Sequence, residues 1–301
     1  MINDNRNMTC ARPAAPRPIA ALTLVAVLVG PAVPWAHQGQ NPSPMVEHTR
    51  PHPRRSDAPP EGQREPLELG TLFVPKGLKK SAQLFIHFHG GALIPEIAAA
   101  RNKVAVISMQ LGTGSSVYGR PFADPLLFAR LIAEAEAKSH LRFTAIVLTS
   151  WSAGYGAVRA ILRVPEHYAR VDRVMLIDGM HASYVGDAPG TGPGQESVLV
   201  PEDLAIFATF ARDAVNGRKR MIVSHSEIFP GTYASTTETT DWLVTTLGLR
   251  LKAVLRWGPV GMQQLSEARG GQFLLIGYAG NSAPDHVDQL QALPEFFKWL
   301  K

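Results

Sequence analysis

Cysteine is almost absent from this chain. Its 301 residues include a single cysteine, Cys10, so no disulfide bond can form within the chain. Cys10 also lies ahead of the apolar run at 19–30, on the wrong side for a lipid-modified cysteine at a cleavage site. A domain without disulfides depends on its hydrophobic core, and roughly 235 residues are enough to build a sizeable one.

Charged residues are also scarce, at 18% of the chain, and neither sign dominates. Lys and Arg total 30 against 25 Asp and Glu, which gives a net charge of +5. Because the cations form no stripe interleaved with aromatic residues, the sequence argues against a nucleic-acid-binding protein. Apolar residues make up 45%, and no internal repeat is found, which indicates one well-packed globular domain.

The first 36 residues have the pattern of a secretory signal peptide. Three arginines precede an uncharged apolar run at 19–30, which is too short to span a bilayer comfortably. Small residues follow, and we expect cleavage after Ala32 or Ala36, with Met8 as an alternative start. The mature protein is therefore expected to be secreted or periplasmic, without stable membrane insertion. The alternative is an uncleaved N-terminal membrane anchor.

Residues 37–66 differ in composition from everything that follows. They are rich in Pro, Arg, Gln and His and contain almost no large apolar residue, which predicts a flexible linker. Its arginines are matched by acidic residues, so it is not a basic arm. The folded domain is then expected to cover residues 67–301.

The stretch 146–155 carries the functional prediction. Residues 146–149 are β-branched and apolar, as in a buried strand, and apolar residues recur at helical spacing from Val158 onward. Between them, Ser150-Trp-Ser-Ala-Gly154 places Ser152 at a strand-to-helix turn. This is the layout of a nucleophile elbow, G-x-S-x-G, with Ser150 in the place of the first glycine. The alternative is an ordinary turn with a capping serine.

Strands and helices alternate through the whole domain, which predicts an α/β fold with a mainly parallel sheet. Sites in such sheets form beyond the carboxyl ends of the strands. Ser152, Asp178 and His89 follow predicted strands, and His286 comes a few residues after the last one. Strands are predicted at 67–74, 83–88, 104–108, 173–177, 220–224 and 272–277. Helices are predicted at 124–138, 202–215, 235–248 and 287–300. Residues 186–194 predict an irregular loop, and residues 251–271 give no clear pattern.

A serine hydroxyl needs a base, and that base is usually a histidine held by an acid. His286, after the last predicted strand, is the candidate base for Ser152. Asp178 is the favoured acid because its strand directly follows the elbow unit, with Glu227 as the rival. Asp285 is poorly placed to bond the ring of its sequence neighbour.

The glycines after His89 predict a second part of the site. Gly90 and Gly91 let backbone N–H groups point at a developing oxyanion, beside the N–H of Ala153. His87 and His89 also form an H-x-H pair that could ligate a metal, which leaves a metal-dependent hydrolase as an alternative. The further ligands of that alternative would be His181, His225 and Asp178.

Together, Phe88-His-Gly-Gly91, Ser150-Trp-Ser-Ala-Gly154 and Asp285-His286 resemble an α/β-hydrolase of the serine esterase/lipase type. The resemblance covers residues 67–301 and implies a mostly parallel, about eight-stranded sheet with helices on both faces. It also implies a Ser-acid-His triad, an acyl-enzyme and no cofactor. Ser150 departs from the family pattern, as does a pair of glycines where the family has three, and the usual acid position is one strand later than Asp178.

The substrate predicted by this resemblance is a small-molecule or lipid-like ester. His89, Trp151, Tyr155 and Tyr118 are the candidate substrate-binding residues, and the aromatic ones favour an uncharged or apolar acyl group. Each aromatic residue could equally pack in the core. The competing class is a binding protein that keeps this fold without catalysis.

Overall fold

The computed structural model describes residues 57–186 and 198–301. The predicted signal peptide at 1–36, most of the linker at 37–66 and most of the irregular loop at 186–194 lie outside the described residues. No helix within the described ranges is long and apolar enough to cross a membrane.

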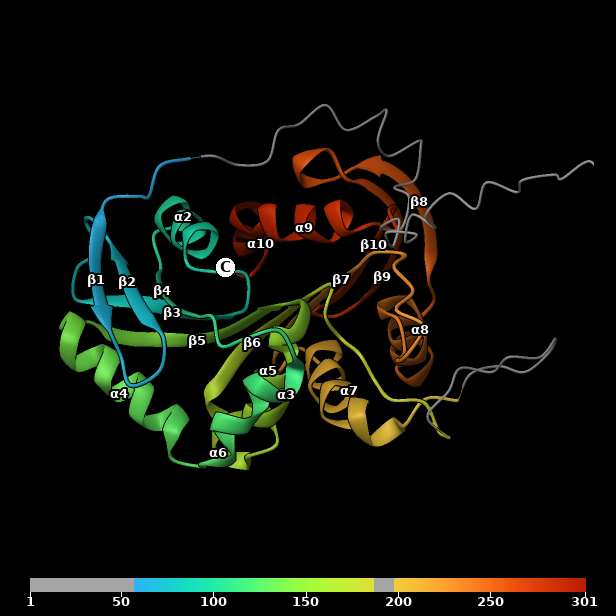
Figure 1. Cartoon of the computed structure of the whole chain (residues 1–301), viewed down its shortest axis with the longest axis horizontal. Coiled ribbons are helices and arrows are strands. Elements are labelled where there is room, and N and C mark those ends of the chain that lie inside the picture. The colour runs from blue at the N-terminus through green and yellow to red at the C-terminus, as the bar shows by residue number, and fades with distance from the viewer. Residues whose placement is uncertain (1–56, 187–197) are drawn as a thin grey trace, which may run out of the picture. The chain divides into compact units, whose positions relative to one another are not determined.

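A single ten-stranded sheet runs through the domain in the order β1-β2-β4-β3-β5-β6-β7-β10-β9-β8 (Figure 1). The six central strands from β4 to β10 pair in parallel, and the two edges pair antiparallel. The mainly parallel sheet is therefore confirmed, with ten strands in place of about eight. The strands are β1 Gly62–Pro66, β2 Thr71–Pro75, β3 Ser81–Phe88, β4 Ala105–Met109, β5 Arg142–Trp151, β6 Val171–Ile177, β7 Arg220–His225, β8 Lys252–Trp257, β9 Gln263–Gly270 and β10 Phe273–Tyr278.

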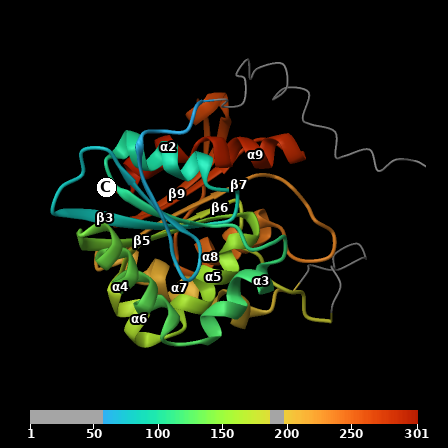
Figure 2. The same cartoon turned by 60° about the vertical axis from the view of Figure 1, so that its left-hand side comes forward.

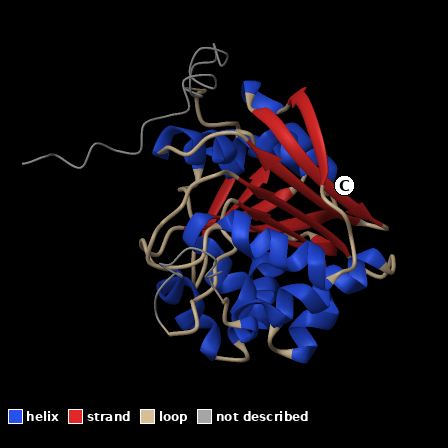
Figure 3. Cartoon of the chain, turned by 90° about the vertical axis from the view of Figure 1, so that its right-hand side faces the viewer, coloured by secondary structure: helices blue, strands red, loops and turns tan. Residues whose placement is uncertain are grey.

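Helices cover both faces of the sheet, as Figures 2 and 3 show from two further sides. One face carries α2 Leu93–Asn102, α9 Ala283–Gln291 and α10 Leu293–Trp299. The other carries α3 Ser115–Gly119, α4 Leu127–Ser139, α5 Tyr155–Leu162, α6 Pro165–Arg170, α7 Pro201–Val215 and α8 Thr236–Thr246.

The apolar strands serve two cores because successive side chains point to opposite faces. In β3, Leu84 and Ile86 belong to the core under α4 and α5, whereas Phe85 belongs to the core under α2 and α10. Phe85 stacks there on Phe297 of α10, with ring centroids 4.2 Å apart. Strand β3 is thus buried on both faces inside the sheet.

The sheet begins inside the segment predicted as a linker. Strand β1 forms at Gly62–Pro66 and pairs with β2, so the ordered domain starts before residue 67. Composition missed this strand because it is an exposed edge strand that needs no apolar face. It is fixed by Arg64, whose guanidinium bonds Glu96 of α2 at 2.6 Å and lies over the ring of Phe73.

Three further elements differ from the prediction. The helix expected from Asp124 begins at Leu127, since Asp124 Oδ1 accepts the N–H of Leu126 in a turn ahead of it. The closing helix breaks at Ala292, ahead of Pro294, into α9 and α10. Residues 252–270, which gave no clear pattern, form the edge hairpin of β8 and β9.

Candidate active site

Ser152 lies at the sharp turn between β5 and α5, with a backbone φ of +49°. A positive φ is unusual for a residue with a Cβ and marks local strain. Gly154 is required beside it, because a Cβ there would overlap the carbonyl oxygen of Phe88. Ser150, at the other small position, is fully buried and its hydroxyl has no hydrogen-bond partner. Ser150 therefore fits at this position, but its hydroxyl stays unpaired, whereas a glycine would have no hydroxyl to pair.

His286 and Asp178 meet at the same edge of the sheet as Ser152. Asp178 follows β6, and its Oδ2 accepts a hydrogen bond of 2.7 Å from His286 Nδ1. The turn after Asp178 is tight: its φ is +43°, and a Cβ at Gly179 would overlap the backbone of Ser152. Because Nδ1 donates to the carboxylate, Nε2 is the atom of His286 that can take a proton.

The Asp178 carboxylate is buried and well supplied with donors. Its Oδ1 accepts from Ser226 N at 2.8 Å and from Thr236 Oγ1 at 3.0 Å, and the Ser226 hydroxyl reaches both carboxylate oxygens. Burial alone would raise the pKa of this carboxyl, but the bond and charge of His286 and the Ser226 donors lower it to about 2. Asp178 therefore carries its charge at neutral pH.

The other two candidate carboxylates have different partners. Glu227 Oε2 accepts the N–H of Gly280 at 3.2 Å, which ties the loop after β7 to the loop after β10. Asp285 Oδ2 accepts from the hydroxyl of Ser282 at 2.6 Å and completes a capping box at the start of α9. Asp285 thus fixes the helix that presents His286.

A cavity of about 520 Å³ lies over Ser152, Asp178 and His286. The structure records no hydrogen bond between Ser152 Oγ and the His286 ring, both of which are described residues. Such contacts are often long before substrate binds. The shared cavity is what brings the hydroxyl and Nε2 into one space.

The predicted oxyanion loop is folded as a run of left-handed residues. His89, Gly90 and Gly91 have φ values of +74°, +99° and +77°. The N–H groups of Gly90 and Gly91 converge, as expected for anion binding, but both donate to Gln110 Oε1, at 2.9 and 3.0 Å. An oxyanion could bind these two groups only after the Gln110 side chain moves. Ala153, the third predicted donor residue, lines a cavity beside Ser152.

Three of the four predicted substrate-binding residues form a stack against His286. Trp151 packs on the His286 ring at 4.5 Å and on the His89 ring at 5.1 Å, and its indole N–H bonds the His286 carbonyl. His89 Nδ1 bonds the hydroxyl of Tyr118 at 2.7 Å, and Tyr118 is fully buried. These three residues hold His286 by packing, whereas Tyr155 alone of the four lines a cavity beside Ser152.

The H-x-H pair is split by the end of β3. His87 is fully buried within the strand, where Nδ1 contacts Thr149 Oγ1 at 2.9 Å and burial lowers its pKa to about 3. His89 lies beyond the strand in the left-handed turn. Within residues 57–186 and 198–301, no three His, Cys, Asp or Glu side chains gather as a metal site would need.

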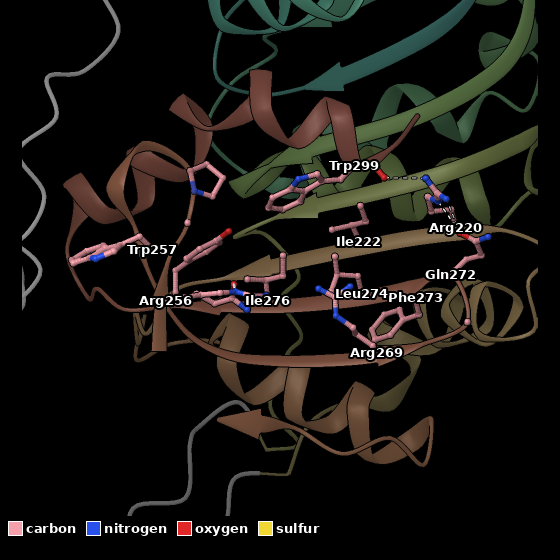
Figure 4. Close-up of a pocket in the computed structure, with 15 residues that line it drawn as sticks. Arg220, Ile222, Arg256, Trp257, Arg269, Gln272, Phe273, Leu274, Ile276 and Trp299 are labelled. Carbon is pink, nitrogen blue, oxygen red and sulfur yellow. Dashed lines mark hydrogen bonds between the residues drawn. The ribbon is translucent and has the colours of Figure 1, made fainter. Parts of the chain in front are cut away.

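The largest of the described cavities lies elsewhere. It measures about 580 Å³ and is lined by residues of β7 to β10 together with Trp299 of α10 (Figure 4). The Arg220 guanidinium in this cavity donates to Gln272 and to backbone carbonyls at the chain end. None of the residues that line it is Ser152, Asp178 or His286, so cavity size alone would have misplaced the site.

No family model and no curated protein matches this sequence. Solved structures do resemble it. A poly(3-hydroxybutyrate) depolymerase, LpqC, from Bordetella parapertussis is 17% identical over 75% of this chain and 83% of its own, with a TM-score of 0.45. A thermostable esterase from Pseudomonas putida ECU1011 is 13% identical over 68% of this chain and 74% of its own, with a TM-score of 0.43. A hormone-sensitive lipase from a metagenome library is 12% identical over 85% of this chain and 89% of its own, with a TM-score of 0.46.

The sheet of this chain places the segments that carry the motifs where the sequence predicted them. The elbow follows β5 in the middle of the parallel strands, and the histidine follows β10, the last parallel strand. The proteins that it resembles in structure are named as esterases, a lipase and a depolymerase.

The sequence did not reveal several residues around Ser152. His181, Tyr233, Arg159 and Asp203 line a second cavity of about 460 Å³ that also contains Ser152. They come from four separate segments, and only His181 was named from the sequence, as a ligand of the metal alternative and not as a residue beside Ser152. Ser226 was missed as well, although the polar run after β7 places it at the same edge as Asp178.

Proposed function

We propose that the protein is a serine hydrolase that cleaves carboxylic esters. Ser152 Oγ attacks the ester carbonyl while His286 Nε2 removes its proton, and the alcohol leaves after His286 returns that proton to its oxygen. Water then hydrolyses the acyl-enzyme by the same steps. Asp178 keeps the His286 proton on Nδ1 and stabilises the imidazolium that forms.

The observation that carries this proposal is the 2.7 Å bond between His286 Nδ1 and Asp178 Oδ2, at a cavity that also contains the strained Ser152. An aspartate held by Ser226 and Thr236 from the far side cannot turn away from the histidine. An orienting acid of this kind has no evident use in a protein that merely binds, so the geometry favours catalysis over a non-catalytic role.

The oxyanion would be held by the Ala153 N–H, joined by Gly90 and Gly91 once Gln110 releases them. A negatively charged oxygen competes well for two converging N–H groups, because charge-assisted hydrogen bonds are about twice as strong as those to a neutral amide oxygen. In this scheme Gln110 keeps the left-handed turn folded in the absence of substrate.

We further propose that the enzyme is exported. This rests on the arginine-flanked apolar run at 19–30 and on the small residues after it. Intact-mass measurement of protein recovered outside the cytoplasm should show the first 36 residues removed. A mass that still includes Met1 or Met8 would instead indicate an anchor or a cytoplasmic protein.

The test of the serine mechanism is covalent labelling with a fluorophosphonate probe, together with rates on a p-nitrophenyl ester. Wild-type protein should be labelled, and Ser152→Ala should lose labelling and roughly 10⁴- to 10⁶-fold in turnover. Ser150→Ala is the matched control, since that buried hydroxyl has no partner and should be dispensable. Unlabelled wild-type protein, or an active Ser152→Ala, would overturn the proposal.

A further inference from the structure

Two cavities meet at Ser152, and the catalytic groups distinguish them. Ser152, His181 and Tyr233 line both. His286 lines only the cavity of about 520 Å³, whereas Ala153 lines only the cavity of about 460 Å³. The reacting ester must therefore lie across Ser152 with one part in each cavity.

The mechanism sets which part goes where, so this inference rests on the proposed function. His286 must protonate the oxygen of the departing alcohol, which requires the alcohol part to lie on the His286 side. The acyl part then takes the cavity that His286 does not line, where Ala153 can donate its N–H to the oxyanion. The larger cavity is then the alcohol site, and the smaller one is the acyl site.

The walls of the two cavities differ in chemistry. Ile228, Pro230 and Ala283 give the alcohol cavity apolar surface. The acyl cavity is lined by the hydroxyl residues Thr113, Ser115, Ser116 and Ser183 and by the ion pair of Arg159 and Asp203.

Each charge in the acyl cavity is already matched by its neighbours. Arg159 Nη1 lies 3.1 Å from Asp203 Oδ1, and Asp203 Oδ2 accepts the N–H of Ser183 at 2.8 Å. Tyr155 donates to Ser115 Oγ at 3.2 Å, and its ring packs under the Arg159 guanidinium. The wall is thus polar without a net charge, which suits a neutral hydroxylated group better than a carboxylate, an ammonium or a long alkyl chain.

His181, which lines both cavities, provides an acceptor where they meet. Its Nδ1 lies 2.8 Å from the carbonyl oxygen of Ala234, which can only accept, so Nδ1 carries the proton. Burial lowers the pKa of His181, which keeps the ring neutral and leaves Nε2 with a free lone pair. The rings of Tyr155 and Tyr233 hold it edge-on, with centroids 5.6 and 4.9 Å away. A rigid acceptor therefore lies beside the nucleophile and is not used by the triad.

We propose that the acyl cavity selects short acyl groups that carry a hydroxyl, and that His181 Nε2 accepts a hydrogen bond from this hydroxyl. An acyl group without it would leave Nε2 without a partner where the substrate displaces water. Sites built to bind a hydroxyl reject analogues that lack it, and one hydrogen bond lost in this way corresponds to about tenfold or more in kcat/KM. His181 is thus a specificity-determining residue.

The experiment compares phenyl butyrate with phenyl 2-hydroxybutyrate and phenyl 3-hydroxybutyrate, which share one alcohol. Wild-type enzyme should prefer at least one hydroxybutyrate over butyrate by about tenfold or more in kcat/KM. In His181→Phe, which keeps a ring of similar size but no acceptor, this ratio should fall to about one. In His181→Gln, whose amide oxygen can replace Nε2, the ratio should be largely retained.

The outcomes separate this inference from the proposed function. If wild-type protein cleaves none of the three esters and takes no fluorophosphonate label, the proposed function fails. If it cleaves all three with equal kcat/KM, or prefers butyrate, the hydroxyacyl inference fails while the serine mechanism stands. A preference that His181→Phe retains would reassign the hydroxyl site to other residues and would overturn the role of His181. If His181→Phe does not fold, the wild-type ratio still decides whether the enzyme prefers hydroxyacyl esters.

Discussion

The Asp178→Asn variant gives the sharpest test of the triad, because the surroundings of Asp178 dictate how the amide must lie. Asn tolerates the left-handed backbone, so the φ of +43° should survive the exchange. Oδ1 of Asp178 accepts the backbone N–H of Ser226, a donor that cannot be reversed. The amide oxygen must therefore take the Oδ1 place, which turns the NH₂ group toward His286.

That orientation changes the tautomer of His286. His286 Nδ1 now meets a donor, so it must accept, and the ring proton moves to Nε2. Nε2 can then no longer take the proton of Ser152. An amide that holds the wrong tautomer should lower turnover roughly 10⁴-fold. Stability should change far less, by about 1–3 kcal/mol, because the Ser226 and Thr236 bonds to the oxygen persist.

The assay is p-nitrophenyl ester hydrolysis, with thermal melts of the same preparations. Glu227→Gln is the control, since an amide oxygen can still accept the N–H of Gly280, and we expect nearly wild-type rates. An Asp178→Asn variant that retains more than about a tenth of wild-type turnover would refute the tautomer reasoning. A folded and active Asp178→Asn beside an inactive Glu227→Gln would move the acid to Glu227.

Three further predictions follow from neighbouring features. Gln110→Glu should lower kcat, because a carboxylate would hold the N–H groups of Gly90 and Gly91 more tightly against the oxyanion; an unchanged kcat would place the oxyanion on other donors. Dialysis against a chelator should leave hydrolysis unchanged, and loss of activity with recovery on adding zinc would favour the metal-dependent alternative. Because the Asp178 pKa of about 2 lies below the unfolded value of about 3.9, its contribution to stability is present above about pH 4 and lost as the pH falls toward 2. Asp178→Asn should therefore lose less unfolding free energy than wild type between about pH 5 and 2 in urea titrations, and equal losses would contradict the assigned pKa.

The buried parts of the fold were predictable because their sequence signals are local. Central parallel strands are covered on both faces, so their apolar runs are continuous, and each strand end is marked by a change to polar or small residues. The helix predicted at 235–248 is confirmed as α8, and its start carries a local signal, the capping box of Ser235 and Glu238. Since the carboxyl ends of the parallel strands share one edge, the strand ends predicted a common location for Ser152, Asp178 and His286, and in the structure these three line one cavity.

The exposed edges of the sheet were not predictable in the same way. Strands β1 and β8 have almost no buried face, so no period of two separates them from a loop. Their stability comes from partners far away in sequence. Arg64 bonds Glu96 of α2, and Arg256 of β8 bonds Glu267 of β9. A charged residue in such a strand looks, from sequence alone, like a charged residue in a linker.

The acid and the acyl cavity show why a site is harder to predict than a fold. Asp178 follows β6, which pairs with the elbow strand β5, whereas Glu227 follows β7, one strand further along. What brings Asp178 to His286 is one left-handed turn and Ser226, which arrives from β7 to hold the carboxylate. The acyl cavity depends on still more distant pieces, because α3, α5 and α7 each contribute one wall around His181. The candidate nucleophile can be predicted from sequence because Ser152 lies within one strand-turn-helix segment. The acyl cavity cannot be predicted in this way, because its residues come from several segments that only the fold brings together.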